Sequence, residues 1–112
     1  MMKLSNIVKK LPLKIITVSN DNLVTGAYTS DLLSDVIAKA EKNQLWITLH
    51  SHQNIVAVAL LKDLSGIIIT GGHKPDDKTI EKAREENLPI FITEMNSFEI
   101  SGLLYQLLSK NE

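Results

Sequence analysis

The sequence predicts an α/β fold, a three-layer α/β/α domain whose central sheet is mostly parallel. Apolar runs of strand length alternate along the chain with stretches whose apolar residues recur at helical spacing, and this alternation is typical of βαβ units rather than hairpins. The most apolar run, "GIIIT" at 66–70, lacks polar alternation, as expected for a parallel strand covered on both faces. We therefore expect this strand inside the sheet.

Length and composition predict a single domain over residues 1–112. A chain of 112 residues with 44% hydrophobic residues can build one core. The formal charge of -1 lacks the basic excess of nucleic-acid binding, and no stretch approaches the roughly 18 apolar residues of a membrane span. Without cysteine there is no disulfide, thiolate-bound zinc or iron–sulfur cluster. We expect a soluble cytoplasmic protein without cofactor, nucleic-acid or membrane partner.

The first part of the chain predicts a short helix and then a strand. The apolar residues of "SNIVKKL" at 5–11 share one helical face, and Ser5 or Asn6 is expected to cap this helix. Pro12 ends it, because proline lacks the backbone N–H that a helix needs. "LKIITV" at 13–18 is rich in β-branched residues, which favour a strand.

The next segment predicts an extended stretch, a helix and a second strand. Residues 24–31 are expected to stay extended until Ser30 or Asp31 caps an amphipathic helix over 31–43. "LWITL" at 45–49 is a short apolar run and predicts the next strand.

The second half contains one ambiguous segment, "HSHQNIVAVALLKDL" at 50–64. Its β-branched residues suit a strand, but its length and its place between two strands favour a buried helix. "PDDKTIEKAREENLP" at 75–89 predicts a surface helix, and "IFIT" at 90–93 predicts the last strand. A helix over 96–110, which Ser97 is expected to cap, closes the pattern.

In open parallel α/β sheets, ligands bind where the carboxyl ends of the strands lead into helices. The four loops expected there are rich in hydroxyl, amide, imidazole and glycine groups; they span 28–31, 49–54, 70–77 and 93–99. We expect these loops to form one pocket for a small anionic ligand, since such groups bind anions near helix N-termini. The predicted ligand-binding residues are Tyr28, Ser30, Thr48, His50, Thr70, Gly71, Gly72 and Asn96.

The glycine pair in "TGGHKPDD" at 70–77 does not form a nucleotide-binding P-loop. That motif needs the spacing G-x-x-x-x-G-K-[ST], which is absent, and Pro75 removes a backbone donor from the turn. Thr70, Gly71 and Gly72 still offer hydroxyl and amide donors to an anion. The competing interpretation is a turn that only redirects the chain.

No catalytic residue and no metal site are predicted. His50, His52 and His73 fall in loops that meet if their strands are neighbours, yet the sequence specifies no partners to orient them. The acidic pairs spaced four residues apart fit charges that answer helix dipoles; these pairs are Asp31 with Asp35 and Asp77 with Glu81.

Three segments resemble the DRTGG domain, a family similar to the N-terminal domain of HPr serine kinase/phosphorylase: "VTGAYTSDLLSDVIAKA", "LWITLHSHQNIVAVALL" and "IIITGGHKPDDKTIEKAREENLPIFIT". The likeness covers nearly the whole chain, and "DNLVTGAY" keeps Asp21, Thr25 and Gly26 of the Asp-Arg-Thr-Gly-Gly name. The resemblance implies an α/β/α domain found beside CBS, phosphotransacetylase and HPr kinase modules, with short members often encoded near iron–iron hydrogenase subunits. It implies regulation, ligand sensing and self-association more than catalysis.

Two function classes follow. The first is a non-catalytic regulatory module that binds a small anionic metabolite or docks on a metabolic, hydrogenase-associated enzyme. The alternative is a small phosphoryl-transfer enzyme of the HPr kinase type. The only candidate nucleophile with a neighbouring base in the sequence is Ser51, which lies between two histidines. We also predict a homodimer, because the helix at 96–110 is apolar on several sides. Either "ISGLLYQLLSK" at 100–110 or the "DLLSDVIA" helix at 31–38 is expected to contribute to the interface. The residues expected to be exposed in a monomer are Leu104, Tyr105 and Leu108.

Overall fold

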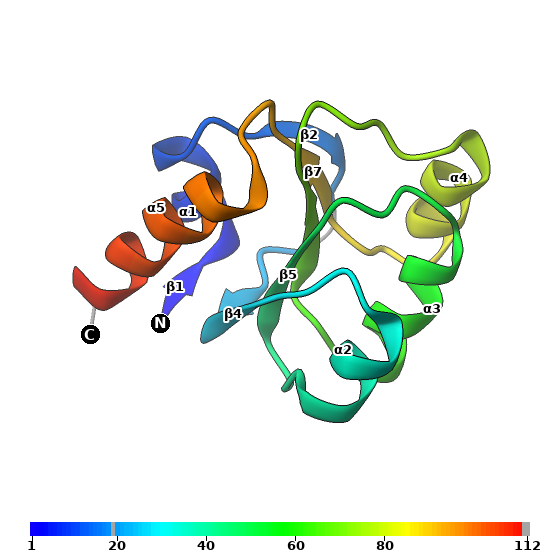
Figure 1. Cartoon of the computed structure of the whole chain (residues 1–112), viewed down its shortest axis with the longest axis horizontal. Helices are drawn as coiled ribbons and strands as arrows, with labels where there is room; N and C mark the ends of the chain where they lie inside the picture. Colours follow the sequence, from blue (N-terminus) through cyan, green and yellow to red (C-terminus); the bar gives the residue numbers. More distant parts are fainter. Residues whose placement is uncertain (19, 111–112) are drawn as a thin grey trace.

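A computed structural model describes residues 1–18 and 20–110 of the chain (Figure 1). Its helices and strands, in chain order, are β1 (Met2–Lys3), α1 (Leu4–Lys10), β2 (Lys14–Thr17), β3 (Leu23–Val24), β4 (Gly26–Thr29), α2 (Leu33–Lys39), β5 (Gln44–Thr48), α3 (Asn54–Leu61), β6 (Gly66–Ile69), α4 (Asp77–Glu85), β7 (Ile90–Ile92) and α5 (Ser97–Lys110).

The central sheet has five strands in the order β2-β7-β6-β5-β4, and β1 and β3 form a small sheet of their own. Strands β4, β5, β6 and β7 run parallel, whereas β2 pairs antiparallel with β7 at one edge. The middle strand is β6, which confirms the position predicted for "GIIIT". The ambiguous segment before it is helical, as predicted, because α3 must carry the chain back between two parallel strands.

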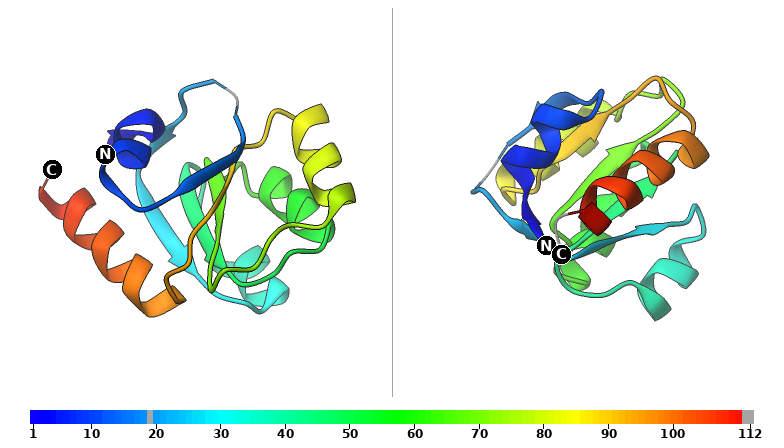
Figure 2. Two further views of the ribbon diagram at one scale, coloured as in Figure 1. Left: turned by 90° about the horizontal axis from the view of Figure 1, so that it is seen from above. Right: turned by 90° about the vertical axis from the view of Figure 1, so that its left-hand side faces the viewer.

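The helices form two layers, with α1 and α5 on one face of the sheet and α2, α3 and α4 on the other (Figures 1 and 2). Successive side chains of a strand point to opposite faces. Trp46 therefore joins the core on the side of α2, α3 and α4. Leu45 and Ile47 join the core on the other side, together with Ile7 of α1 and Leu104 of α5. The predicted three-layer α/β/α architecture is confirmed.

The start of α1 differs from the prediction. Ser5 and Asn6 lie inside the helix, which begins at Leu4, and neither caps it. The carboxylate of Asp21 takes that place: it accepts the backbone N–H of Ser5 at 2.9 Å and the Ser5 hydroxyl at 2.8 Å. These two hydrogen bonds lower the pKa of Asp21, the backbone bond contributing more.

The predicted caps of α2 and α5 are also wrong. Leu32 holds the capping position of α2 and offers no side-chain cap, although the Ser30 hydroxyl accepts the backbone N–H of Leu32 at 3.2 Å just before the helix. At α5 the capping residue is Asn96 instead of Ser97. The side-chain oxygen of Asn96 accepts the backbone N–H of Glu99 at 2.9 Å, and the Glu99 carboxylate accepts the N–H of Asn96 at 3.2 Å. Such a reciprocal pair satisfies two donors that a helix start leaves open.

One side chain helps to attach the antiparallel strand β2. The pairing of β2 with β7 shifts register between Ile15 and Thr17. At this irregularity the buried hydroxyl of Thr17 donates to the Leu88 carbonyl at 2.6 Å and accepts the N–H of Ile90 at 2.8 Å. A threonine thereby satisfies two backbone groups at the start of β7.

Helix α5 buries a different side from the one predicted. Leu104 is 0% exposed and Leu108 is 8% exposed, so both belong to the core and neither is a free surface residue. The exposed aromatic side chains of α5 are Phe98 and Tyr105. Among the described residues, no helix has the length and apolar character needed to cross a membrane.

Candidate functional site

The carboxyl ends of the parallel strands bring the four predicted loops together along one edge of the sheet. Backbone hydrogen bonds join neighbouring loops: the N–H of Thr70 donates to the carbonyl of Thr48 at 2.9 Å, and the N–H of Gly71 donates to the carbonyl of Met95 at 2.8 Å. The N–H of Ser30 likewise donates to the end of β5. This arrangement is the one expected from the parallel strand order.

Asp31 places a carboxylate at the end of β5. One of its oxygens accepts the hydroxyl of Thr48 and the backbone N–H of Leu49, both at 2.9 Å. The backbone carbonyl of Asp31 also contacts the ring of His50. The assignment of Asp31 to the dipole of α2 is therefore wrong, because the donors of β5 hold this carboxylate. An internal anion already occupies donors that an anionic ligand would use.

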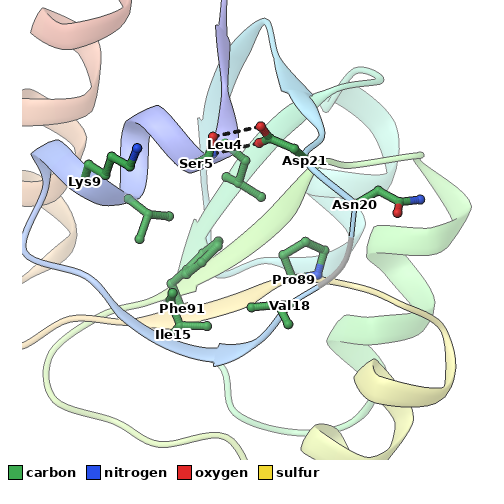
Figure 3. A pocket seen from close by; sticks show the side chains of 10 residues that line it. Leu4, Ser5, Lys9, Ile15, Val18, Asn20, Asp21, Pro89 and Phe91 are labelled. Atoms are coloured by element: carbon green, nitrogen blue, oxygen red, sulfur yellow. Dashed lines mark hydrogen bonds between the residues drawn. The ribbon is translucent and has the colours of Figure 1, made fainter.

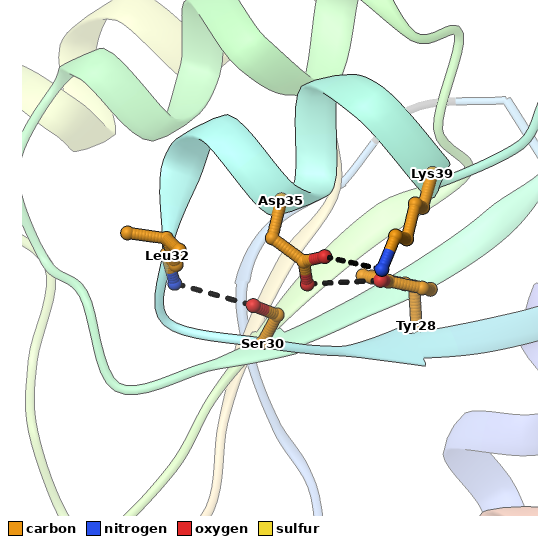
Figure 4. Close-up of polar contacts among 5 residues, drawn as sticks. All are labelled: Tyr28, Ser30, Leu32, Asp35 and Lys39. Carbon is orange, nitrogen blue, oxygen red and sulfur yellow. Dashed lines mark hydrogen bonds and ion pairs between the residues drawn. The ribbon is translucent and has the colours of Figure 1, made fainter.

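Tyr28 and Asp35 connect β4 to α2 (Figure 4). The Tyr28 hydroxyl donates to the Asp35 carboxylate at 2.8 Å, and the ammonium of Lys39 lies 3.6 Å from the other carboxylate oxygen. The hydrogen bond from Tyr28, followed by one from Ser30, lowers the pKa of Asp35. The same Tyr28–Asp35 bond raises the pKa of Tyr28, because ionising the phenol would place two negative charges together.

Replacing Asp35 with Asn is expected to reduce stability mainly in the pH range between the two titrations. The folded pKa of Asp35 lies below its unfolded value of about 3.9, so its contribution is present above that pH and is lost as the pH falls through the folded pKa. The folded pKa of Tyr28 lies above its unfolded value of about 10, so that contribution is lost as the pH rises through the folded pKa. Urea denaturation from pH 2 to pH 11 measures both limits.

Tyr28→Phe should show a loss of the same sign, since it removes the hydroxyl that bonds the Asp35 carboxylate, whereas Asp35→Asn removes the charge of that carboxylate and keeps an oxygen that can accept. Tyr105→Phe is the matched control, because Tyr105 is an exposed tyrosine on another helix. A constant stability difference between Asp35→Asn and the unmodified protein across the whole pH range would show that protonation of Asp35 and Tyr28 does not affect stability.

The glycine pair after β6 forms a turn whose donors are already engaged. Gly71 and Gly72 have φ angles of 70° and 74°, which side chains with a Cβ rarely adopt. The N–H of Gly72 donates to the carbonyl of Thr93 at 3.0 Å, alongside the bond from Gly71 to the same loop. The hydroxyl of Thr70 bonds that of Ser97 at 2.9 Å. These groups fasten the loop before α5 to the end of β6.

Gly71→Ala and Gly72→Ala are both expected to destabilise the protein. Each change forces alanine into the left-handed region, at about 1–2 kcal/mol. A Cβ at position 72 would also lie 2.5 Å from a carboxylate oxygen of Glu94, but this oxygen ends a flexible, exposed side chain that can move away; a Cβ at position 71 would lie 3.3 Å from the ring of His73. Thermal denaturation is therefore expected to show similar losses for the two variants. A larger loss in Gly72→Ala that disappears when Glu94 is replaced by alanine would show that Glu94 resists displacement.

The three loop histidines have separate surroundings. His50 contacts the Asp31 carbonyl, and a ring nitrogen of His52 accepts the backbone N–H of Asn54 at 3.2 Å. The ring of His73 lies beside Gly71. Within residues 1–18 and 20–110, no three histidine or acidic side chains are grouped closely enough to hold a metal ion.

The eight predicted ligand-binding residues share one edge but divide by the contacts they make. Those from β4 and β5 bond to the two aspartates that flank the start of α2, namely Tyr28 to Asp35 and Thr48 to Asp31. Thr70, Gly71 and Gly72, which follow β6, bond to residues between β7 and the start of α5. Gly72 additionally lines a cavity of about 320 Å³ beside the start of β2.

A second cavity, of about 360 Å³, lies between α1, β2 and the start of β7 (Figure 3). Its walls are apolar and come from Leu4, Val8, Ile15, Val18, Pro89 and Phe91. Its polar lining residues are Ser5, Lys9, Asn20 and Asp21. Sequence reasoning missed this cavity. No sequence pattern marks it, because Val18 ends the run 13–18 that predicts a strand, and its exposure of 67% is seen only in the structure.

A shallow groove of about 600 Å³ separates the edge strand β4 from the outer side of α5. Phe98 and Tyr105 border it and are 87% and 75% exposed. Gly102 lies between them on the same helical face, with no atom within 4 Å of where its Cβ would be. We call the set Phe98, Gly102, Tyr105 and Ser109 the outer face of α5; it carries no charged residue.

Comparison with known proteins gives a family and a related fold. The sequence profile of the DRTGG domain matches residues 6–107. No curated protein matches the chain. Among solved structures, the chain resembles the CBS and DRTGG domains of the regulatory region of a Clostridium perfringens pyrophosphatase, crystallised with the activator diadenosine tetraphosphate. The TM-score is 0.68 at 22% sequence identity, over 90% of this chain and 44% of the other. This likeness shows a shared fold with less than half of the larger structure.

Proposed function

The chain belongs to the DRTGG domain family, and from this premise we propose that it is a cytoplasmic regulatory module that senses a small anionic ligand and catalyses no reaction. The related fold is part of a regulatory region crystallised with a nucleotide activator, which supports a regulatory role. We propose that residues 1–112 act as one domain.

The observation that carries this proposal is the carboxylate of Asp31 on the donors of β5. An incoming anion would take its place on the Thr48 hydroxyl and the Leu49 N–H. The loop before α2 would then be released, so ligand binding would favour a second arrangement of that loop. A sensor requires two states that differ in ligand affinity. The proposed ligand-binding residues are Tyr28, Ser30, Thr48, His50, Thr70, Gly71, Gly72 and Asn96.

Neither Asp35 nor Tyr28 is suited to proton transfer at neutral pH. A general acid or base works best when its pKa lies near the working pH. The pKa of Asp35 is lowered and that of Tyr28 is raised, so each of these shifts moves away from neutral pH. Both groups act as structural hydrogen-bonding partners at this edge.

Thermal denaturation with added inorganic phosphate, acetyl phosphate, ATP or diadenosine tetraphosphate tests the proposed function. A ligand that binds only the folded state stabilises it by about 2.7 kcal/mol at one hundred times its dissociation constant. Thr48→Val should abolish this ligand-dependent stabilisation, because it removes the hydroxyl now held by Asp31. Thr25→Val is the matched control, since the Thr25 hydroxyl bonds Lys42 at the opposite end of the sheet.

Two results would overturn the proposal. Stabilisation that persists unchanged in Thr48→Val would place the ligand elsewhere. Release of phosphate from ATP or acetyl phosphate at a rate proportional to protein concentration would instead support a phosphoryl-transfer enzyme of the HPr kinase type.

We also propose that two copies of the chain associate through the outer face of α5. This surface exposes two aromatic rings with a glycine between them, and exposed apolar patches of this kind mark association sites. A two-fold axis would cover the rings of Phe98 and Tyr105 with the same face of the other copy. A metabolic enzyme, such as a hydrogenase, is the competing occupant of the same face.

Light scattering at increasing protein concentration tests the dimer. Phe98→Asp should shift the protein to a monomer while leaving its thermal denaturation almost unchanged, because the side chain is 87% exposed. Leu61→Asp, at an exposed leucine of α3, is the control. A monomer at high micromolar concentration would contradict the homodimer.

A further inference from the structure

We propose that the cavity between α1, β2 and β7 binds a flat ring system that carries one anionic group. This site is separate from the ligand edge, because it lies at the amino end of β7 on the face covered by α1. Its volume of about 360 Å³ falls within the range of roughly 300–1,000 Å³ found for small-molecule sites. It is therefore large enough for a molecule with two fused rings.

The apolar part of the cavity fits a ring. Phe91 and Pro89 line it from β7 and the residue before it, and Ile15 and Val18 line it from β2 and the residue after it (Figure 3). Ile15 is 49% exposed and Val18 is 67% exposed. Covering both side chains with a flat apolar body removes this exposed surface from water, which favours binding in proportion to the area covered.

The charges around the cavity select an anionic substituent. Residues 1–18 contain four lysines and no acidic residue, and the side chain of Lys9 stands at the rim. The only carboxylate among the lining residues, that of Asp21, is turned to Ser5, which donates two hydrogen bonds to it. In Figure 3, Lys9 and Asp21 lie on opposite sides of Ser5. The Asp21 carboxylate keeps its charge, so an anionic group is expected on the Lys9 side of Ser5, away from that carboxylate.

The test uses two probes that share one ring system. 1-Anilinonaphthalene-8-sulfonate carries a sulfonate, whereas N-phenyl-1-naphthylamine lacks it. Fluorescence titration of the folded protein should show saturable one-to-one binding of both, with the sulfonate compound binding about three- to tenfold tighter, as expected for one partly exposed ion pair. Lys9→Ala should remove this preference for the anionic probe, and Lys10→Ala, next in sequence and outside the cavity, should keep it.

A second pair of variants tests the apolar wall. Val18→Asp should weaken binding of both probes at least about tenfold, since it places a solvated charge against the ring. Leu61→Asp makes the same change on α3 at a residue that is 66% exposed, against 67% for Val18, and should leave binding unchanged. Equal weakening by the two variants, unchanged binding in Val18→Asp, or no saturable binding would each overturn the proposal. The Thr48→Val variant should bind both probes as tightly as the unmodified protein does. A negative result for this cavity is therefore distinguishable from a negative result for the proposed anion site at Thr48.

Discussion

Leu104→Asp is expected to prevent folding. The leucine is 0% exposed and belongs to the core between α5 and the sheet, beside Ile47 and Ile68. Removing such a side chain costs about 2–5 kcal/mol, and burying an unpaired carboxylate adds several kcal/mol more. The sum is comparable to the whole stability of a small domain, about 5–15 kcal/mol. Far-ultraviolet circular dichroism at 25 °C should show loss of helix.

Two further variants separate a core position from a surface one. Leu104→Ala should fold and lose about 2–5 kcal/mol in urea denaturation. Tyr105→Asp, one position further along α5, should retain the stability of the unmodified protein, because Tyr105 is 75% exposed. If Leu104→Asp folded and changed only the association state, Leu104 would be an interface residue instead of a core residue.

Thr17→Val is expected to destabilise the protein by about 2–6 kcal/mol, because it leaves two buried backbone groups without partners at about 1–3 kcal/mol each. The Thr17 hydroxyl donates to the carbonyl of Leu88 and accepts the N–H of Ile90, and valine has the same shape without either function. Thermal and urea denaturation measure the loss.

Thr17→Ser is the matched control for this position. It keeps the hydroxyl and removes only a methyl group, so it should cost about 1 kcal/mol and retain both hydrogen bonds. A serine variant as unstable as the valine variant would show that the methyl packing, rather than the hydroxyl, holds β2 in place.

The sequence allowed the fold to be predicted because apolar periodicity is a local property. The run of isoleucines in "GIIIT" indicated a strand covered on both faces, and β6 has that position. The direction of β2 was not predictable in the same way, since an apolar strand has the same composition whether it pairs parallel or antiparallel. The rotation of α5 was also missed, because leucines on several sides do not show which side meets the sheet.

The polar contacts of the candidate site were harder to predict than its location. The loops at the strand ends follow from the strand order alone. The partners of their side chains come from distant segments: Asp31 bonds Thr48, and Asp21 bonds Ser5. Local rules assigned Asp31 and Ser5 to helix ends, where each residue type is common. Competition from a donor or acceptor elsewhere in the chain overrode those preferences.

The antiparallel pairing of β2 with β7 sets an order for folding during protein synthesis. Lys14 pairs with Ile92, so β2 leaves the ribosome long before its partner strand exists, because synthesis starts at the N-terminus. The parallel pairs β4–β5 and β5–β6 can form earlier, and the sheet grows outward from them. The waiting segment carries Lys9, Lys10 and Lys14, and such charges discourage pairing with strands of other nascent chains. Strand β2 therefore cannot take its place in the sheet until β7 has been synthesised.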